Sequence, residues 1–335
     1  MTDVVLSLEE VEALAHRLLR RAGASELQAT PTARSIRDAE ADGIRTVGLA
    51  YLPAYLEHVR IGKVVGTAVP VVTTPRPATV VVDAGNGFCH PAFLAGEAPL
   101  VEAARAGGIA TMALVHSYSA GVVGWFVERL ADAGLVAMMF ANTSALLAPY
   151  GGRRAFFGTN PMAWAAPRRH GSPVVADLSA SAVAWVTVDA AARAGTSIPL
   201  GWAIDADGEP TTDPQRALGG AMSPAGGHKG SAWALLVEVL AGGLAGPHFS
   251  HEASNLVGPE GGPPDVGQIV IALDPGIVHH DAVLDRLDSE FTALAAEAGA
   301  RLPGTRRLDA RISAQRDGVR VPTDLLTTLE NAAGP

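Results

Sequence analysis

The chain has little cysteine, with Cys89 the single one among its 335 residues. One cysteine cannot close an intramolecular disulfide and cannot supply a four-cysteine zinc site. This usage is typical of proteins in a reducing compartment, so we expect a cytoplasmic protein.

Clusters of basic residues and long apolar runs are also missing. Lysine and arginine number 25 against 34 acidic residues, and the net charge is −9 without a basic cluster, so nucleic acid is not an expected partner. The longest apolar segment, 231–246, contains Glu238 and is shorter than the ~20 residues of a membrane span. Glu9, Glu10 and Glu12 stand where a signal peptide needs an apolar core. We therefore expect no membrane association.

Several well-known motifs are absent. No GxGxxG follows a predicted strand, and the nearest match, Gly85-Asn86-Gly87, lacks the third glycine and the helix that should follow it. HExxH, the P-loop and GxSxG are missing too. The acidic residues Asp205, Asp207 and Asp213 match no calcium loop. A standard Rossmann site is therefore not predicted, and we expect no metal.

Apolar residues make up 48% of the chain and charged residues 18%, which is typical of a packed globular protein with two domains or lobes. A capping box at Ser7–Glu10 opens a helix that ends at Gly23. Further helices are predicted at 27–42, 49–59, 91–107, 122–134, 181–194, 230–243, 280–298 and 321–332, and strands at 78–83, 109–115, 135–141, 162–166, 173–177 and 268–273.

The order of these elements predicts the domain organisation. Helices dominate residues 1–75, and strands alternate with helices from residue 76 to residue 304. Strand–helix–strand alternation favours parallel pairing and an α/β core. We expect the C-terminal segment, 305–335, to complete the helical lobe formed by residues 1–75.

Two loops at predicted strand ends are candidates for a binding site, because open α/β sheets bind ligands beyond the carboxyl ends of their strands. One loop is 116–121, with His116, Tyr118 and Ser119; the other combines Asn142 with 158–161. Ordinary turn chemistry remains an alternative for each of these residues. Other histidines, such as His58, are expected at the surface.

A glycine-rich segment, Gly226-Gly227-His228-Lys229-Gly230, opens a long apolar run. A lysine and free backbone N–H groups at a helix N-terminus form an anion site, and a cofactor phosphate is the expected anion. The alternative is a glycine-rich cap on a buried helix. The sequence of this segment alone does not decide between an anion site and a helix cap.

Together these motifs identify a family. The chain resembles the type 2 malate/L-lactate dehydrogenases, a family of NAD(P)-dependent 2-hydroxyacid dehydrogenases that includes ureidoglycolate and sulfolactate dehydrogenases and the Δ1-piperideine-2-carboxylate/Δ1-pyrroline-2-carboxylate reductases. AAPR, DLSASAVA and GGHKGSA are most similar to the imine-reducing branch. The matching pieces are APYGG at 148–152, GTNP at 158–161, GWAIDADGEPTTDP at 201–214, GGHKG at 226–230, GQIVIALDP at 267–275 and LPG at 302–304.

The resemblance implies a non-Rossmann α/β fold: a mixed sheet with helices on its faces and a helical lobe from both chain ends. It also implies a homodimer with its site near the interface, and NADPH or NADH as cofactor, a choice that the sequence leaves open. The residues that it assigns to cofactor binding are Asn142, Thr159, Asn160, His228, Lys229, Gly230, Pro303, Gly304 and Arg306.

The chain departs from the family where substrates are handled. Val47 stands in place of a histidine and Tyr51 in place of an arginine, in a segment that otherwise matches G-x-x-S-H-G-x-x-R-L-x-x-Y. Ser119 replaces a second histidine, and Thr187 replaces an aspartate of the imine-reducing branch. The usual acid/base and carboxylate-binding groups are therefore missing.

These losses bear on the reaction. Reducing a ketone needs a proton donor, whose removal costs ~10²–10⁴ in rate, and losing arginine removes a carboxylate clamp. An iminium arrives already protonated and needs mainly positioning. We therefore expect an NAD(P)H-dependent reductase of a small molecule with a C=N or an unusual C=O bond. Candidates for substrate contact or proton donation are Tyr51, Ser119, His116 and Tyr118, beside Val47.

Two alternatives stay open. One is a 2-hydroxyacid dehydrogenase of malate or lactate type with relocated acid/base groups. The other is a pseudoenzyme that binds the cofactor without chemistry. Turnover with a panel of imines, ketones and 2-oxoacids separates all three.

Overall fold

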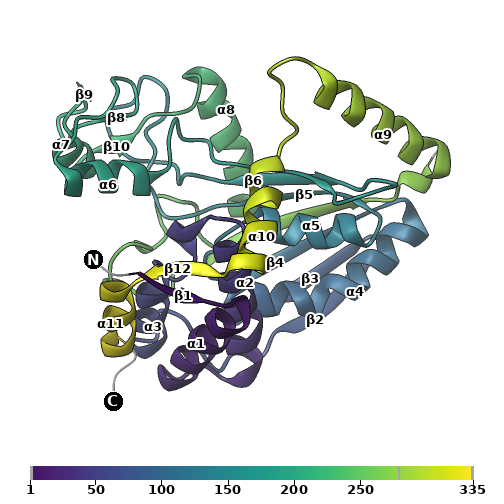
Figure 1. The fold of residues 1–335 in the computed structure, drawn as a ribbon, viewed down its shortest axis with the longest axis horizontal. Coiled ribbons are helices and arrows are strands. Elements are labelled where there is room, and N and C mark those ends of the chain that lie inside the picture. The colour runs from purple at the N-terminus through teal and green to yellow at the C-terminus, as the bar shows by residue number, and fades with distance from the viewer. Residues whose placement is uncertain (1–2, 278–279, 333–335) are drawn as a thin grey trace.

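A computed structural model describes residues 3–277 and 280–332 (Figure 1). Its centre is a seven-stranded sheet in the order β2-β3-β4-β11-β5-β6-β7. The strands are β2 (Val71–Arg76), β3 (Thr79–Asp83), β4 (Ile109–Ser117), β5 (Val136–Ala141), β6 (Met162–Ala166), β7 (Val174–Leu178) and β11 (Val266–Leu273). The mixed α/β fold agrees with the expectation.

The pairing differs from the prediction in one respect. Only β3 and β4 pair in parallel, and every other described pair in this sheet is antiparallel. Parallel pairing of the strands predicted at 109–115 and 135–141 is wrong, because β11 lies between β4 and β5 and is antiparallel to both. The inserted strand comes from more than a hundred residues further along the chain, where local alternation carries no information.

The directions of the strands in the sheet indicate where a binding site can form. β4 and β5 run the same way because each is antiparallel to β11, and β7 runs the same way because two antiparallel steps, through β6, separate it from β5. The carboxyl ends of these three strands therefore meet at one edge of the sheet. Polar residues that follow them can share a cavity.

Helices α4 (Cys89–Gly107) and α5 (Gly124–Asp132) cover a face of the sheet (Figure 1). Apolar side chains of both helices join those of the strands in one buried core that includes Phe93 and Phe126. Gly96 lets α4 approach closely, since a Cβ atom there would lie 2.4 Å from Sδ of Met112. The two helices thus pack on the strands that lead to the site described below.

The two chain ends lie side by side (Figure 1). Strand β1 (Asp3–Leu6) pairs with β12 (Val319–Pro322), and their neighbours share a second core. The capping box of Ser7 and Glu10 is present as predicted. The helices of this region are α1 (Leu8–Arg21), α2 (Glu26–Ala41), η1 (Arg45–Val47), α3 (Leu52–Arg60), α10 (Thr305–Asp317) and α11 (Thr323–Ala332).

A third region has its own core around Leu147, Val188 and Met222. It contains α6 (Trp185–Ala194), α7 (Pro214–Leu218), α8 (His228–Val237), η2 (Glu238–Gly243) and a small sheet of β8 (Ala203–Ile204), β9 (Pro210–Thr211) and β10 (Ala221–Met222). The remaining elements are η3 (Pro275–Ile277) and α9 (His280–Ala296). Within the described ranges, no helix has the length and apolar character to cross a bilayer.

Candidate active site

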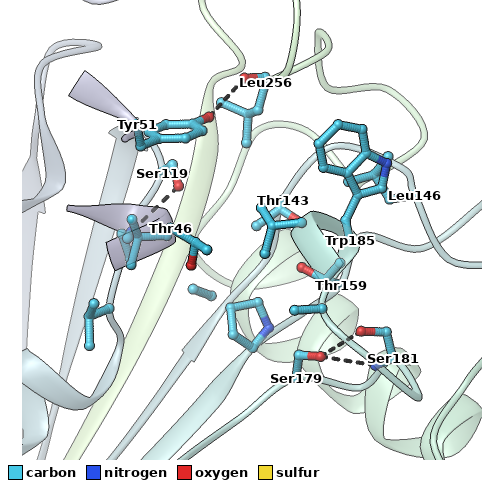
Figure 2. A pocket seen from close by; sticks show the side chains of 18 of the residues that line it. Thr46, Tyr51, Ser119, Thr143, Leu146, Thr159, Ser179, Ser181, Trp185 and Leu256 are labelled. Carbon is cyan, nitrogen blue, oxygen red and sulfur yellow. Dashed lines mark hydrogen bonds between the residues drawn. The ribbon is translucent and has the colours of Figure 1, made fainter. Parts of the chain in front are cut away.

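A cavity of about 410 Å³ lies where the three strand ends meet the helical chain ends. Ser119 follows β4, Thr143 follows β5 and Asp177 lies at the end of β7, and all three line it. Figure 2 shows Thr46, Tyr51 and Ser119 on one side of the cavity and Thr159, Trp185 and the Ser179–Ser181 turn on the other. Most of the wall is apolar or carries hydroxyl groups.

Few charged side chains line this cavity. Among the described residues that line it, Asp177 is the one with an ionised side chain, and no lysine, arginine or histidine takes part. Oδ2 of Asp177 accepts a hydrogen bond of 2.7 Å from the backbone N–H of Gly124. Gly124 is suited to this approach, because a Cβ atom there would lie 3.3 Å from the Asp177 carboxylate. The cavity thus offers an anionic group and neutral donors.

A longer cleft of about 860 Å³ adjoins the cavity and shares Ile44, Val122 and Asp177 with it. Arg301 and Arg306 line this cleft together with Pro303 and Gly304. The cationic side chains of the cleft suit the anionic phosphates of a dinucleotide, and the largely apolar cavity beside it suits the nicotinamide, which is neutral in the reduced form. Oγ1 of Thr143 is buried in the cavity wall without a hydrogen-bond partner, as a site awaiting a polar ligand group leaves it.

Three of the predicted substrate contacts, Val47, Tyr51 and Ser119, line the cavity. The Tyr51 hydroxyl donates to the carbonyl of Leu256 at 2.9 Å, and its ring packs edge-on against Tyr55. Desolvation by burial raises the pKa of Tyr51. Tyr51 therefore presents its ring to the cavity while its hydroxyl holds the wall, which disfavours it as a proton donor.

The other two predicted contacts lie elsewhere. Tyr118 is 1% exposed, and its hydroxyl is 2.5 Å from Nδ1 of His58. The ring of His116 pairs with Asp265 at 3.0 Å, and neither His116 nor Tyr118 lines the cavity or the cleft. Their placement outside both linings does not favour contact with substrate, which stays a prediction. His58 is buried rather than at the surface, because Tyr118 and the carbonyl of Gly258 bond both of its ring nitrogens.

Asn142 and Asn160, two predicted cofactor contacts, are fully buried. The Asn142 side chain donates to the carbonyl of His248 and accepts from the backbone N–H of Gly267. Asn160 donates to the Glu238 carboxylate at 2.6 Å. Both side chains join segments of the protein, and their contact with the cofactor stays a prediction.

The remaining predicted cofactor residues fall into three places. Thr159 lines the cavity, and Pro303, Gly304 and Arg306 line the cleft. His228, Lys229 and Gly230 form the start of α8, outside both linings. This helix start nevertheless adjoins the Ser179–Ser181 turn, because the N–H of Ala225 donates to the carbonyl of Ala180. The anion site predicted at α8 stays a prediction.

Reasoning from the sequence missed Asp177, Trp185 and the hydroxyl pair of Ser179 and Ser181. Asp177 is the first residue of DLSASAVA, a segment that carries the family resemblance. The available signal was an acidic residue at the end of a strand, directly before a serine-rich turn. No group of three or more histidine, cysteine, aspartate or glutamate side chains suited to a metal occurs in the described part of the chain.

The loop that carries Leu256 into the cavity is held by a buried lysine. Nζ of Lys63 donates to the carbonyls of Asn255, Gly258 and Glu260 at 2.5, 3.0 and 2.6 Å. Lys63 is 1% exposed, so its charge is compensated by these carbonyl dipoles. The helical region thereby fixes one wall of the cavity.

We expect the substitution Lys63→Met to release this loop. Hydrogen bonds to charged groups contribute about 1.5–3 kcal/mol each, so a loss on the order of 2 kcal/mol in the free energy of unfolding is expected after relaxation. Denaturant unfolding measures that loss, and substrate titration should show a higher KM. Arg60→Met, at an exposed position on α3, serves as control. Equal stability of the two variants would contradict the assignment.

The fold and the paired cavity and cleft define a dinucleotide-dependent enzyme without a Rossmann domain. The family model for malate/L-lactate dehydrogenase matches residues 6–330. The chain therefore belongs to the malate/L-lactate dehydrogenase family, as its motifs indicated.

Individual relatives cover nearly the whole chain. A (2R)-3-sulfolactate dehydrogenase (NADP(+)) of Chromohalobacter salexigens is 45% identical over 90% of each chain. A Δ1-pyrroline-2-carboxylate reductase of Burkholderia ambifaria is 41% identical over 98% of this chain and 99% of the relative. The crystal structure of a Δ1-piperideine-2-carboxylate reductase from Pseudomonas syringae superposes with a TM-score of 0.92 at 37% identity, covering 98% of this chain and 99% of the other.

Proposed function

We propose that the protein is an NAD(P)H-dependent oxidoreductase that transfers hydride to the carbon of a C=N bond in a small cyclic imine. The observation that carries this proposal is the charge of the cavity. Asp177 is its one acidic lining side chain among the described residues, so the cavity suits a substrate with a basic nitrogen such as a cyclic imine. A doubly charged oxoacid would meet repulsion there and no arginine clamp.

The named activities of the relatives support the same reaction. The proteins from Burkholderia ambifaria and Pseudomonas syringae are named as reductases of cyclic imine carboxylates. We propose that a single carboxylate on the substrate is bound by neutral donors, for which Thr46 and Ser119 are placed on one side of the cavity (Figure 2). The compact cavity favours a ring of five or six atoms.

The cofactor proposal is NADPH or NADH in the cleft lined by Arg301, Pro303, Gly304 and Arg306. When bound, the reduced nicotinamide supplies the hydride. The chain's own contribution is to place the substrate beside Asp177 and to enclose it with apolar side chains such as Trp185 and Leu256. Enclosure of this kind orients the reactants and excludes water.

A substrate panel tests the proposal. We expect oxidation of NADPH or NADH with Δ1-pyrroline-2-carboxylate or Δ1-piperideine-2-carboxylate, followed by absorbance at the reduced nicotinamide band. Pyruvate and oxaloacetate should be reduced far more slowly. Efficient reduction of these oxoacids with the cyclic imines untouched would overturn the proposal.

A C=O substrate is a second candidate, favoured by the sulfolactate dehydrogenase among the relatives. Reduction of a C=O bond yields an alcohol, so a donor in the site must give a proton to the substrate oxygen. Including 3-sulfopyruvate in the panel decides between the two. A pseudoenzyme would bind the cofactor and turn over none of these compounds.

We also propose a cytoplasmic homodimer, built from a helical lobe at both chain ends and an α/β core, with the boundary predicted at residues 75 and 76 moved to before β2, which belongs to the sheet. The homodimer is supported by an exposed apolar stretch on α8 and η2 that includes Trp233, Leu235 and Val239. A cytoplasmic location is supported by the single cysteine, Cys89, which is buried with a free thiol.

A further inference from the structure

Asp177 occupies the junction of the cavity and the cleft, and it is one of three residues that line both. The other two, Ile44 and Val122, are apolar. Any pair of ligands that meet between cleft and cavity therefore meets at this carboxylate. It reaches that position because β7 runs in the same direction as β4 and β5, so that its carboxyl end joins theirs.

Few groups in the cavity can exchange a proton. Of its described lining residues, only Tyr51, Tyr55 and Asp177 have titratable side chains. The Tyr51 hydroxyl is committed to the carbonyl of Leu256, and burial raises the pKa of Tyr55 far above its ordinary value. The serine and threonine hydroxyls are too weakly acidic to donate a proton unaided. Asp177 is the remaining acid.

The surroundings of Asp177 suit proton transfer. Desolvation raises its pKa to about 6, against the lowering effects of the Gly124 N–H and the Arg307 guanidinium. The Arg307 guanidinium donates hydrogen bonds to Glu128 and Asp42, so it is only a partial counter-ion for the Asp177 carboxylate. Arg301 lines the same cleft from the segment before α10, Arg306 lines it from the start of α10, and Asp42 lines it from the end of α2. A carboxyl group in this range populates both protonation states near neutral pH.

We propose that Asp177 is the catalytic proton donor of the reduction. This inference rests on the proposed function. The Asp177 carboxyl gives its proton to the substrate nitrogen, the carbon receives hydride from the dihydronicotinamide, and the C=N π electrons become the nitrogen–hydrogen bond pair. The products are a secondary amine, the oxidised nicotinamide and the Asp177 carboxylate, which takes up a proton from water.

The substitution Asp177→Asn tests this role, because the amide keeps an oxygen to accept the Gly124 N–H. We expect kcat/KM for a cyclic imine to fall by about 10²–10⁴-fold. In the wild-type enzyme kcat/KM should decline as the pH rises above about 6, since the acid form is the active one, and this dependence on Asp177 should vanish in the variant. Asp189→Asn, which removes an aspartate of α6 that pairs with Arg193, should leave activity unchanged.

An N-methylated cyclic iminium separates proton donation from positioning, because it carries a fixed charge and needs no proton. Asp177→Asn should reduce it with nearly the wild-type kcat, because a lost attraction for the cation raises only KM, and should fail with the parent imine. Equal losses on both substrates, or unchanged kinetics on the parent imine, overturn the assignment of Asp177. A wild-type enzyme that reduces no member of the panel overturns the proposed function as well. Thermal unfolding and cofactor binding of the variant show that it is folded.

Discussion

The substitution Glu128→Gln is expected to lower the free energy of unfolding by about 3–5 kcal/mol, as measured by denaturant unfolding. Both Glu128 oxygens accept hydrogen bonds from Arg307 at 2.7 and 2.9 Å, and they also accept from Arg311. Arg311 in turn binds Asp42 with two nitrogens. Neutralising one carboxylate leaves the largely buried Arg307 and the partly exposed Arg311 with a single counter-ion in the cluster.

This ion cluster joins α10 to α2 and α5 and so fastens the C-terminal segment to both the helical region and the sheet. An exposed pair on α4 and α5 provides the control. Glu97→Gln breaks only the contact of Glu97 with Arg129, which is accessible to water, and should cost about 0.2–1 kcal/mol. Similar losses for Glu97→Gln and Glu128→Gln would contradict the structural importance of the cluster.

Gly230→Ala is the second substitution with a large expected effect. A Cβ atom at this position would lie 2.3 Å from the carbonyl oxygen of Ala225 and 2.9 Å from that of Ala180. Both obstacles are backbone, so the α8 start and the serine turn must move apart. Overpacking of this kind costs about 1–3 kcal/mol or more, and kcat/KM should fall because the turn that carries Ser179 and Ser181 is displaced.

Gly243→Ala is the matched control for Gly230→Ala. It lies in η2, and its nearest contacts for an added Cβ are at an ordinary 3.6 Å. We expect that variant to be as stable as the wild type or slightly more stable. If Gly230→Ala retains full activity and stability, the glycine serves no packing role, and the anion-site interpretation of GGHKG gains weight.

Much of the fold follows from local patterns. The capping box of Ser7 and Glu10 and the apolar periodicity after it predict α1 correctly, and most predicted strands match within a few residues. Helix α10 escaped prediction because its sequence, TRRLDARISAQRD, has no apolar stripe. Its packing depends on Arg307 and Arg311, whose partners are far away in the sequence. Such a helix carries no periodic signal.

The candidate site was predictable only in part. The loops after β4 and β5 were expected to contribute, and Ser119 and Thr159 do line the cavity. Asp177 could not be placed from the sequence, because its position depends on two antiparallel steps that bring β7 into line with β5. His116 and Tyr118 lie at a strand end, as predicted, but line neither the cavity nor the cleft. A polar residue at a strand end can point to either side. Tertiary pairing decides which side it takes.

Hydride transfer to the carbon of a C=N bond is tested most directly with a labelled cofactor. The reduced nicotinamide carries deuterium at C4, on the face from which the hydride is transferred. The wild-type enzyme, given this cofactor and Δ1-piperideine-2-carboxylate, should yield an amine with one deuterium on the former imine carbon, as seen by NMR and mass spectrometry. An amine without deuterium at that carbon, or cofactor binding without any product, would contradict it.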